Sequence, residues 1–151
     1  MDVKSLLNQK SVRLITVTPE TSITDAVALM MQHRIGSLPV TEDGQLLSII
    51  TERDVMFAVN NHADELKDMT VRNIMATDLV TCTADCPLPD AMSLMFENKI
   101  NRRIRHLPIL EDGKLVGIVS NGDLLDAMLD EAEFDNRIMK NYIKNWPEET
   151  A

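Results

Sequence analysis

SLPVTEDGQLLSIITERD, residues 37–54, decides the fold of this chain because a near-copy, HLPILEDGKLVGIVSNGD, stands at residues 106–123. Each copy carries Leu-Pro, then Glu-Asp-Gly, then an apolar run, and each ends in a hydroxyl residue, two spacers and an aspartate. The second copy begins 69 positions after the first (106 − 37). A shared order of this length indicates an internal repeat, whose recognition governs every later step in reading the fold.

The repeat extends towards the N-terminus of each copy. ITVTPETSITDAVALMMQHRI, residues 15–35, aligns with VTCTADCPLPDAMSLMFENKI, residues 80–100, at an offset of 65 (80 − 15). The second copy therefore gains four residues (69 − 65) near residues 98–106. Because an α-helix has about 3.6 residues per turn, this insertion predicts one further helical turn, with Ile100 and Ile104 in phase with Phe96. A loop insertion is the alternative.

Each copy predicts the same order of secondary structure. LITVT, residues 14–18, and LVTCT, residues 79–83, are rich in β-branched residues and predict short strands. Apolar residues then recur at spacings of three and four, which predicts a helix with one buried face. Ser22 is the expected N-cap in the first copy. The apolar positions are Ile23, Ala26, Val27, Met30 and Met31 in the first copy and Leu88, Ala91, Met92, Met95 and Phe96 in the second.

Two strands joined by a glycine-containing turn follow, and a helix is expected to begin after Thr51 or Ser120. The unit is therefore β-α-β-β-α, used twice, and the fold class is α/β (α+β). Outside the repeats, residues 1–9 predict a short helix. Residues 135–146 predict a further amphipathic helix, which must cover either the core of its own chain or a second subunit.

The division of the chain follows from this pattern. Residues 1–68 are expected to hold the first repeat with an N-terminal segment and a polar linker. Residues 69–130 hold the second repeat, and residues 131–151 form a C-terminal amphipathic helix and tail.

Composition narrows the class of protein. The 151 residues carry a formal net charge of −9, which argues against a nucleic-acid partner because phosphate backbones need a basic surface. No apolar run approaches the roughly 20 residues of a membrane span. The first ten residues lack the apolar segment of a secretory signal, so we expect a cytoplasmic protein with no membrane association. Aromatic residues make up only 3%, and an aliphatic core is therefore expected.

Motifs for catalysis or metal binding are missing from the sequence. Cys82 and Cys86 supply two thiols, whereas a structural zinc site needs four ligands, so we expect small buried residues instead. The serines lack a Gly-x-Ser-x-Gly setting, and neither His-Glu-x-x-His nor a Walker-type glycine loop occurs. The sequence therefore predicts no catalytic residue, no metal site and no enzymatic activity.

The repeated hydroxyl-x-x-Asp phrase has two interpretations. In the first, Thr51 or Ser120 caps a helix and Asp54 or Asp123 completes a capping box. In the second, a helix N-terminus with free N–H groups attracts a phosphate, and the aspartate accepts hydrogen bonds from a sugar diol. The residue types alone do not choose between them.

Each half of the chain resembles a CBS domain, the module named after cystathionine β-synthase. AVALMMQHRIGSLPVTEDGQLLSIITERD and AMSLMFENKINRRIRHLPILEDGKLVGIVSNGD carry the resemblance, which covers about residues 10–130. It implies a tandem pair with pseudo-twofold symmetry and two clefts between the repeats. Such pairs commonly bind adenine nucleotides or other adenosyl ligands, and they often form homodimers.

The resemblance also implies which residues would bind a ligand. One cleft would use the hydroxyl-x-x-Asp phrase of the second repeat, and the other cleft would use that of the first. The first cleft would comprise Ser120, Asp123, Ile15, Ile35, Gly36, Ser37 and Lys10. The second would comprise Thr51, Asp54, Arg53, Val80, Arg105 and His106, with Met75 beside them.

Two departures from the family pattern affect the second cleft. The family usually has glycine at one position of the third strand. Gly117 fits this pattern in the second repeat, whereas the first repeat has Ser48 there, and its side chain is expected to narrow the cleft. The insertion lies just before Arg105, within a basic run that also includes Lys99, Arg102 and Arg103. This run is either the solvated face of a helix or a source of positive potential for phosphate.

The resemblance leads to a functional hypothesis. We expect a regulatory module that senses AMP, ADP or ATP, requires no cofactor, and signals to an unidentified protein partner. The alternatives are a ligand-free dimerisation module of the same fold and a binder of S-adenosylmethionine.

Overall fold

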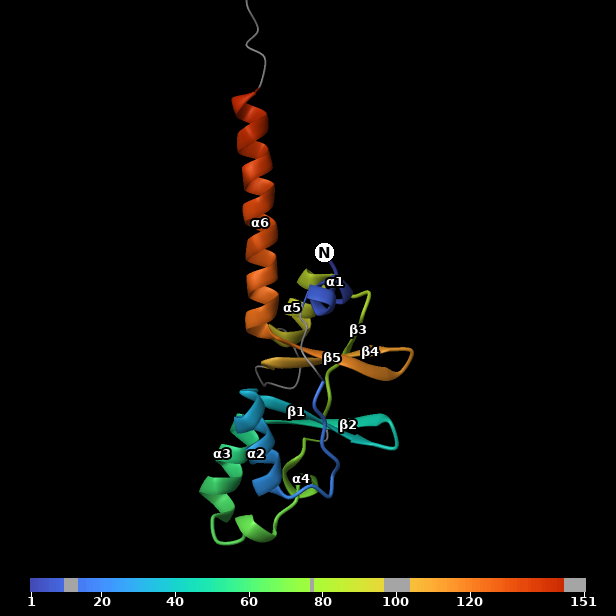
Figure 1. Cartoon of the computed structure of the whole chain (residues 1–151), viewed down its shortest axis with the longest axis vertical. Helices are drawn as coiled ribbons and strands as arrows, with labels where there is room; N and C mark the ends of the chain where they lie inside the picture. The colour runs from blue at the N-terminus through green and yellow to red at the C-terminus, as the bar shows by residue number, and fades with distance from the viewer. Residues whose placement is uncertain (10–13, 77, 97–103, 146–151) are drawn as a thin grey trace, which may run out of the picture.

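The computed structural model describes residues 1–9, 14–76, 78–96 and 104–145. Two β-hairpins lie one above the other in the middle of the molecule, with helices on both outer sides (Figure 1). The first repeat comprises α2 (Ile23–His33), β1 (Ser37–Glu42), β2 (Gln45–Thr51) and α3 (Glu52–His62). The second comprises β3 (Cys82–Thr83), α5 (Leu88–Phe96), β4 (His106–Glu111), β5 (Lys114–Ser120) and α6 (Asn121–Lys144). Three short helices remain, namely α1 (Val3–Gln9), η1 (Leu66–Asp68) and α4 (Val71–Ile74). The predicted fold class and the helix over residues 1–9 are confirmed.

The two hairpins match each other closely. β1 pairs with β2 and β4 with β5, both antiparallel, and each ladder has one irregularity, after Val40 and after Ile109. Both turns are two residues long with positive φ, at 51° and 79° for Asp43 and Gly44 and at 52° and 78° for Asp112 and Gly113. Turns of this type require two residues that tolerate positive φ, and Asp-Gly is a preferred pair.

The predicted helix starts are confirmed by their caps. The Oγ of Ser22 accepts a hydrogen bond from the N–H of Asp25 at 3.1 Å at the start of α2. At the start of α3, the N–H of Thr51 donates to Oδ2 of Asp54 at 2.8 Å. These bonds satisfy backbone donors that the first turn of a helix leaves unpaired.

The strands predicted for residues 14–18 and 79–83 are much shorter than expected. Val17 alone bridges Val40, in parallel, and β3 spans only two residues. The N–H of Val17 donates to the C=O of Pro39 at 3.0 Å, and the next ladder bond would need an N–H from Pro39, which has none. Pro108 stands at the same place beside β3, so it ends that ladder in the same way.

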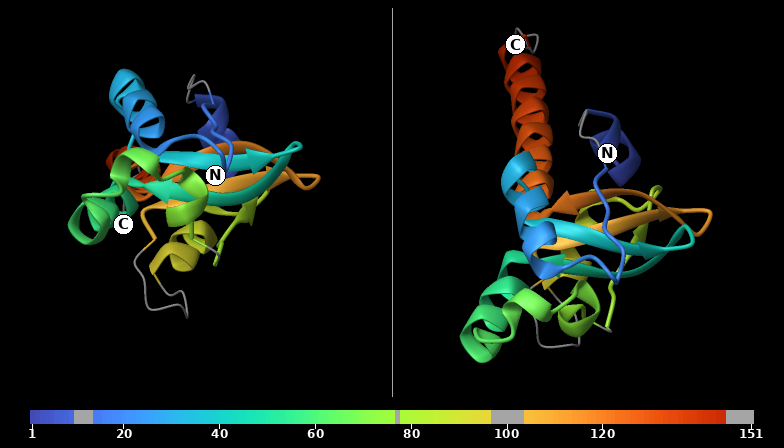
Figure 2. Two further views of the ribbon diagram at one scale, coloured as in Figure 1. Left: turned by 90° about the horizontal axis from the view of Figure 1, so that it is seen from below. Right: turned by 60° about the horizontal axis from the view of Figure 1, so that its bottom comes forward.

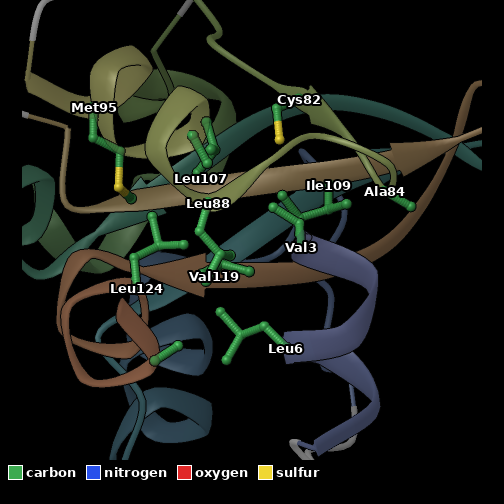
Figure 3. Close-up of a cluster of buried hydrophobic side chains, with 12 residues drawn as sticks. Val3, Leu6, Cys82, Ala84, Leu88, Met95, Leu107, Ile109, Val119 and Leu124 are labelled. Atoms are coloured by element: carbon green, nitrogen blue, oxygen red, sulfur yellow. The ribbon is translucent and has the colours of Figure 1, made fainter. Parts of the chain in front are cut away.

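The short helix that precedes each repeat, α1 or α4, packs into the core of the other repeat. Val3 and Leu6 of α1 are buried among residues of α5, β4, β5 and α6, as Figure 3 shows. The N–H of Val3 donates to the C=O of Cys86 at 2.9 Å. In the same way, Val71 of α4 is buried in the core of the first repeat, where its N–H donates to the C=O of Thr21 at 2.8 Å.

The C-terminal helix predicted for residues 135–146 is the continuation of α6, which runs without a break for 24 residues. Its C-terminal part extends away from the body of the molecule (Figures 1 and 2), and residues 131–145 are exposed throughout. This part therefore does not cover the core of its own chain, which was one of the two predicted roles. Trp146 lies outside the described residues.

The helical turn predicted from the insertion falls mostly on residues 97–103, which lie outside the described residues together with Lys99, Arg102 and Arg103. Ile104 itself is not helical, and its N–H donates to the C=O of Met95 at 3.4 Å. The prediction that Ile104 continues the helix is therefore wrong, because its N–H bonds to a residue nine positions earlier, whereas a helical N–H bonds to the residue four positions earlier. Within the described ranges, no helix is long and apolar enough to cross a membrane.

Candidate functional site

A cavity of about 330 Å³ lies between the two repeats. Its walls come from the segment leading into β1, from β1 itself, from β4 and β5, from the start of α6, and from α1. The lining residues are Leu7, Leu14, Ile15, Arg34, Ile35, Gly36, Ser37, Pro39, His106, Val116, Gly117, Ile118, Ser120 and Asp123. We call it the Ser120 cavity.

The structure brings together most of the residues that the sequence assigns to the first cleft. Six of them line the Ser120 cavity, namely Ser120, Asp123, Ile15, Ile35, Gly36 and Ser37. Lys10, the seventh, lies outside the described residues. The role of these residues in binding stays a prediction, but their convergence from both repeats is a feature of the fold.

Ser120 and Asp123 form a capping box and line the cavity at the same time. The N–H of Ser120 donates to Oδ2 of Asp123 at 3.0 Å, and the N–H of Asp123 donates to Oγ of Ser120 at 3.1 Å. Both side chains are half-buried. The two interpretations of the phrase are therefore compatible, because the cap holds the carboxylate in a fixed position at the cavity wall.

The first turn of α6 does not offer the free N–H groups expected for a phosphate. The N–H of Asn121 donates to the C=O of Arg105 at 2.9 Å, and that of Gly122 donates to Oδ1 of Asn121 at 2.9 Å. The N–H of Asp123 is used by the capping box. Any charge compensation for an anion in this cavity must therefore come mainly from side chains.

Gly117 and Ser48 occupy equivalent strand positions but different surroundings. A Cβ on Gly117 would stand 2.7 Å from Cδ2 of Leu7, so the glycine lets α1 lie close to β5. Ser48 is fully buried and donates from Oγ to the C=O of Ala76 at 2.6 Å. Its side chain thus binds the segment after α4 against β2.

The residues assigned to the second cleft are less clearly brought together. Thr51 and Asp54 form the cap of α3 and are half-buried, while Arg53 is exposed. Arg105 is also exposed, and Val80 packs against the core of the second repeat.

His106 lines the Ser120 cavity. It lies on β4 directly opposite Ser120 on β5, which brings it to that wall. Its assignment to the cleft of Thr51 and Asp54 stays a prediction.

Several lining residues belong to neither of the two predicted clefts. Val116 and Ile118 could have been found, because residues two apart on a strand share a face and these two precede Ser120 on β5. Arg34 belongs to no recognisable motif. It follows α2 with φ 53°, and its N–H caps the helix by donating to the C=O groups of Met30 and Met31.

The Cys82 thiol is not activated for metal binding or thiol chemistry. Burial raises the pKa of the Cys82 thiol to about 12, and a hydrogen bond with Cys86 acts in the same direction. A thiol with this pKa stays protonated, whereas the thiolate is the form that binds metals and attacks disulfides. No cluster of three or more metal-ligating side chains occurs in the ranges that the structure describes.

Comparison with known sequences identifies the repeats. The CBS domain profile matches twice, over residues 3–61 and over residues 71–130. This chain belongs to the CBS domain family. The CBS domain-containing protein YhcV of Bacillus subtilis is 37% identical over 123 residues, which cover 81% of this chain and 84% of that protein.

Solved CBS structures have the same arrangement. The CBS-domain containing protein ATU1752 from Agrobacterium tumefaciens is 35% identical, with a TM-score of 0.77 over 85% of this chain and 99% of that one. CBSX2 in complex with AMP is 27% identical, with a TM-score of 0.69 over 87% and 98% of the two chains. The CBS pair of MJ0100, in complex with 5′-methylthioadenosine and S-adenosyl-L-methionine, is 26% identical, with a TM-score of 0.73 over the same shares.

Proposed function

We propose that this CBS pair is a non-catalytic, cytoplasmic sensor that binds an adenine nucleotide in the Ser120 cavity. The observation that carries the proposal is the convergence of Ile15, Ile35, Ser120 and Asp123 on one cavity. The volume of about 330 Å³ falls within the range of about 300–1,000 Å³ typical of small-molecule sites. The AMP complex of CBSX2 supports the choice of ligand class.

The chemistry of the lining suits a nucleoside. Asp123 is held by its cap and presents a carboxylate, the group that accepts hydrogen bonds from ribose hydroxyls in dinucleotide sites. Ile15 and Ile35 are half-buried and offer apolar surface to an adenine ring. Apolar walls with few polar groups are the usual design of such sites.

Signalling would follow from the shared walls. Because the lining comes from both repeats, a bound nucleotide contacts both at once and favours the relative placement that it fits best. A ligand shifts a conformational equilibrium only by its difference in affinity for the two states. We propose that an unidentified protein partner reads this shift.

Calorimetry and thermal unfolding with AMP, ADP, ATP and S-adenosylmethionine test the proposal. We expect one of the three nucleotides to bind saturably. At a free concentration of 100 times its Kd, it should stabilise the native state by about 2.7 kcal/mol. Tighter binding of S-adenosylmethionine would favour the adenosyl alternative. No binding by any of the four would support a ligand-free interaction module.

We further propose that the protein forms a homodimer through the exposed part of α6. Leu125, Leu129, Met139 and Ile143 are each more than half exposed. Together with Ala132 and Asn136 they are spaced by four and three residues in alternation, which is the repeat of a coiled-coil seam.

The charges along α6 favour a second copy as the occupant of this seam. Its acidic residues all precede its basic residues along the helix. The acidic residues, within 123–135, are Asp123, Asp126, Asp130, Glu131, Glu133 and Asp135, and the basic ones, within 137–144, are Arg137, Lys140 and Lys144. An antiparallel second copy, related by a two-fold axis, would set the acidic stretch of each helix against the basic stretch of the other.

The double substitution Met139→Glu with Ile143→Glu should convert a dimer into a monomer, because it places like charges in the seam. Light scattering coupled to size-exclusion chromatography measures the change in mass. Asn141→Glu, on the opposite side of the helix, is the matched control and should leave the mass unchanged. A wild-type monomer at high micromolar concentration, or a dimer that survives the double substitution, would contradict the proposal.

A further inference from the structure

We infer that Arg34 pairs with the phosphate of the bound nucleotide, so that the Ser120 cavity selects a phosphorylated ligand over an uncharged nucleoside. This inference rests on the proposed function and deepens it. It concerns a residue that the repeated phrases do not contain.

The cavity needs a cation to hold a phosphate. Asp123 contributes a negative charge, and the first-turn N–H groups of α6 are already used within the protein. The phrase of the second repeat has Gly122 where that of the first has Arg53. Among the described residues that line the cavity, Arg34 is the arginine, and no lysine joins it.

Arg34 also holds an unusual backbone conformation. Its φ of 53° lies in the left-handed region, which glycine or asparagine adopts at helix ends with less strain. A residue with a side chain carries backbone strain in this conformation. Strained residues of this kind concentrate at functional sites. The cap bonds to Met30 and Met31 set the backbone from which this guanidinium extends.

The location of Arg34 suits a fixed charge. It stands at the C-terminal end of α2, where the helix dipole favours a cation. A guanidinium stays charged at all physiological pH values and presents paired donors that match phosphate oxygens. Two residues on, Gly36 has no side chain, and the place that a Cβ would take is occupied by the Glu52 carboxylate.

The test compares AMP with adenosine, which differs by the phosphate alone, in calorimetric titrations of the full chain. The wild type should bind AMP more tightly than adenosine. Arg34→Gln should weaken AMP binding by about 10- to 100-fold, the range expected for a lost charge-assisted contact. Adenosine binding should change by less than about 3-fold, and Arg34→Lys should recover part of the loss because it restores the charge.

Two further readouts separate pairing from a structural role. Wild-type affinity for AMP should fall as salt rises, because screening weakens ion pairs, and Arg34→Gln should show a smaller fall. The thermal midpoint without ligand should be unchanged in Arg34→Gln. Arg72→Gln, an exposed arginine of α4 away from the cavity lining, is the matched control and should bind AMP as the wild type does.

Each contrary outcome has a distinct meaning. If wild-type protein binds AMP and Arg34→Gln binds it equally well, the inference is wrong and the proposed function stands. Equal losses for AMP and adenosine would show that Arg34 shapes the cavity without pairing with phosphate, which also overturns the inference. If the wild type binds neither ligand, the proposed function itself fails and the inference fails with it.

Discussion

Asp123→Ala should weaken AMP binding by about 100-fold or more. The carboxylate lines the Ser120 cavity, and hydrogen bonds to a charged acceptor each contribute about 1.5–3 kcal/mol. The same substitution removes the partner of the Ser120 N–H, so the free energy of unfolding should also fall by about 1 kcal/mol. Calorimetric titration measures the first effect and urea unfolding the second.

Two variants separate the loss of binding from the loss of the helix cap. Asp54→Ala removes the equivalent cap from α3, whose bond to the Thr51 N–H is 2.8 Å long, but Asp54 is not part of the Ser120 cavity lining. It should lose similar stability and keep AMP binding at that cavity. Asp123→Asn retains an acceptor for the cap without the charge, so it should lose affinity with little loss of stability. Equal affinity for AMP in Asp123→Ala and the wild type would contradict the assignment of this cleft.

Leu6→Ala should destabilise the second repeat although residue 6 precedes the first. The side chain is 5% exposed and lies in the core formed by α5, β4, β5 and α6. Removing such a side chain typically costs about 2–5 kcal/mol. Hydrogen exchange followed by mass spectrometry should show the largest loss of protection within residues 82–127, with a smaller change within residues 17–58.

Val71→Ala is the reciprocal variant. Its side chain is fully buried in the core of the first repeat, although it stands at the start of the second. Loss of protection should therefore be largest within residues 17–58. If Leu6→Ala instead loosens the first repeat, or if both variants affect both halves equally, the packing seen here does not control local stability.

The hairpins and helix starts could be predicted because their signals are local. Asp-Gly at positions 43–44 and 112–113 specifies a two-residue turn, and Ser22 with Asp25 specifies a cap, whatever the rest of the chain does. The length of the short strands was overestimated because β-propensity does not reveal that the strand they pair with contains a proline, which has no N–H for the ladder. That information lies at Pro39, more than twenty residues from Val17.

Long-range packing was the part that local patterns did not reveal. The pattern of residues 1–9 predicts a helix, but it does not indicate that this helix packs against the second repeat. The same holds for Arg34, whose place in the cavity depends on how the end of α2 meets a hairpin from the other half. Ser120 and Asp123 were anticipated from the repeated phrase, and the other residues of the candidate cleft through the resemblance to CBS domains. The place of His106 in the Ser120 cavity depends on its pairing with Ser120 across β4 and β5, which no local pattern reveals.

Helix α1 packs in the core of the second repeat and α4 in the core of the first, so neither half of the polypeptide contains all of the residues of its own core. A fragment ending near residue 61 would keep α1 without the core it covers, and would lack the α4 segment that its own core requires. An ancestor with a single repeat could have reached the same architecture only as a domain-swapped dimer, in which each molecule packs its N-terminal helix into the core of the other. Gene duplication would then have converted a concentration-dependent assembly into an intramolecular one.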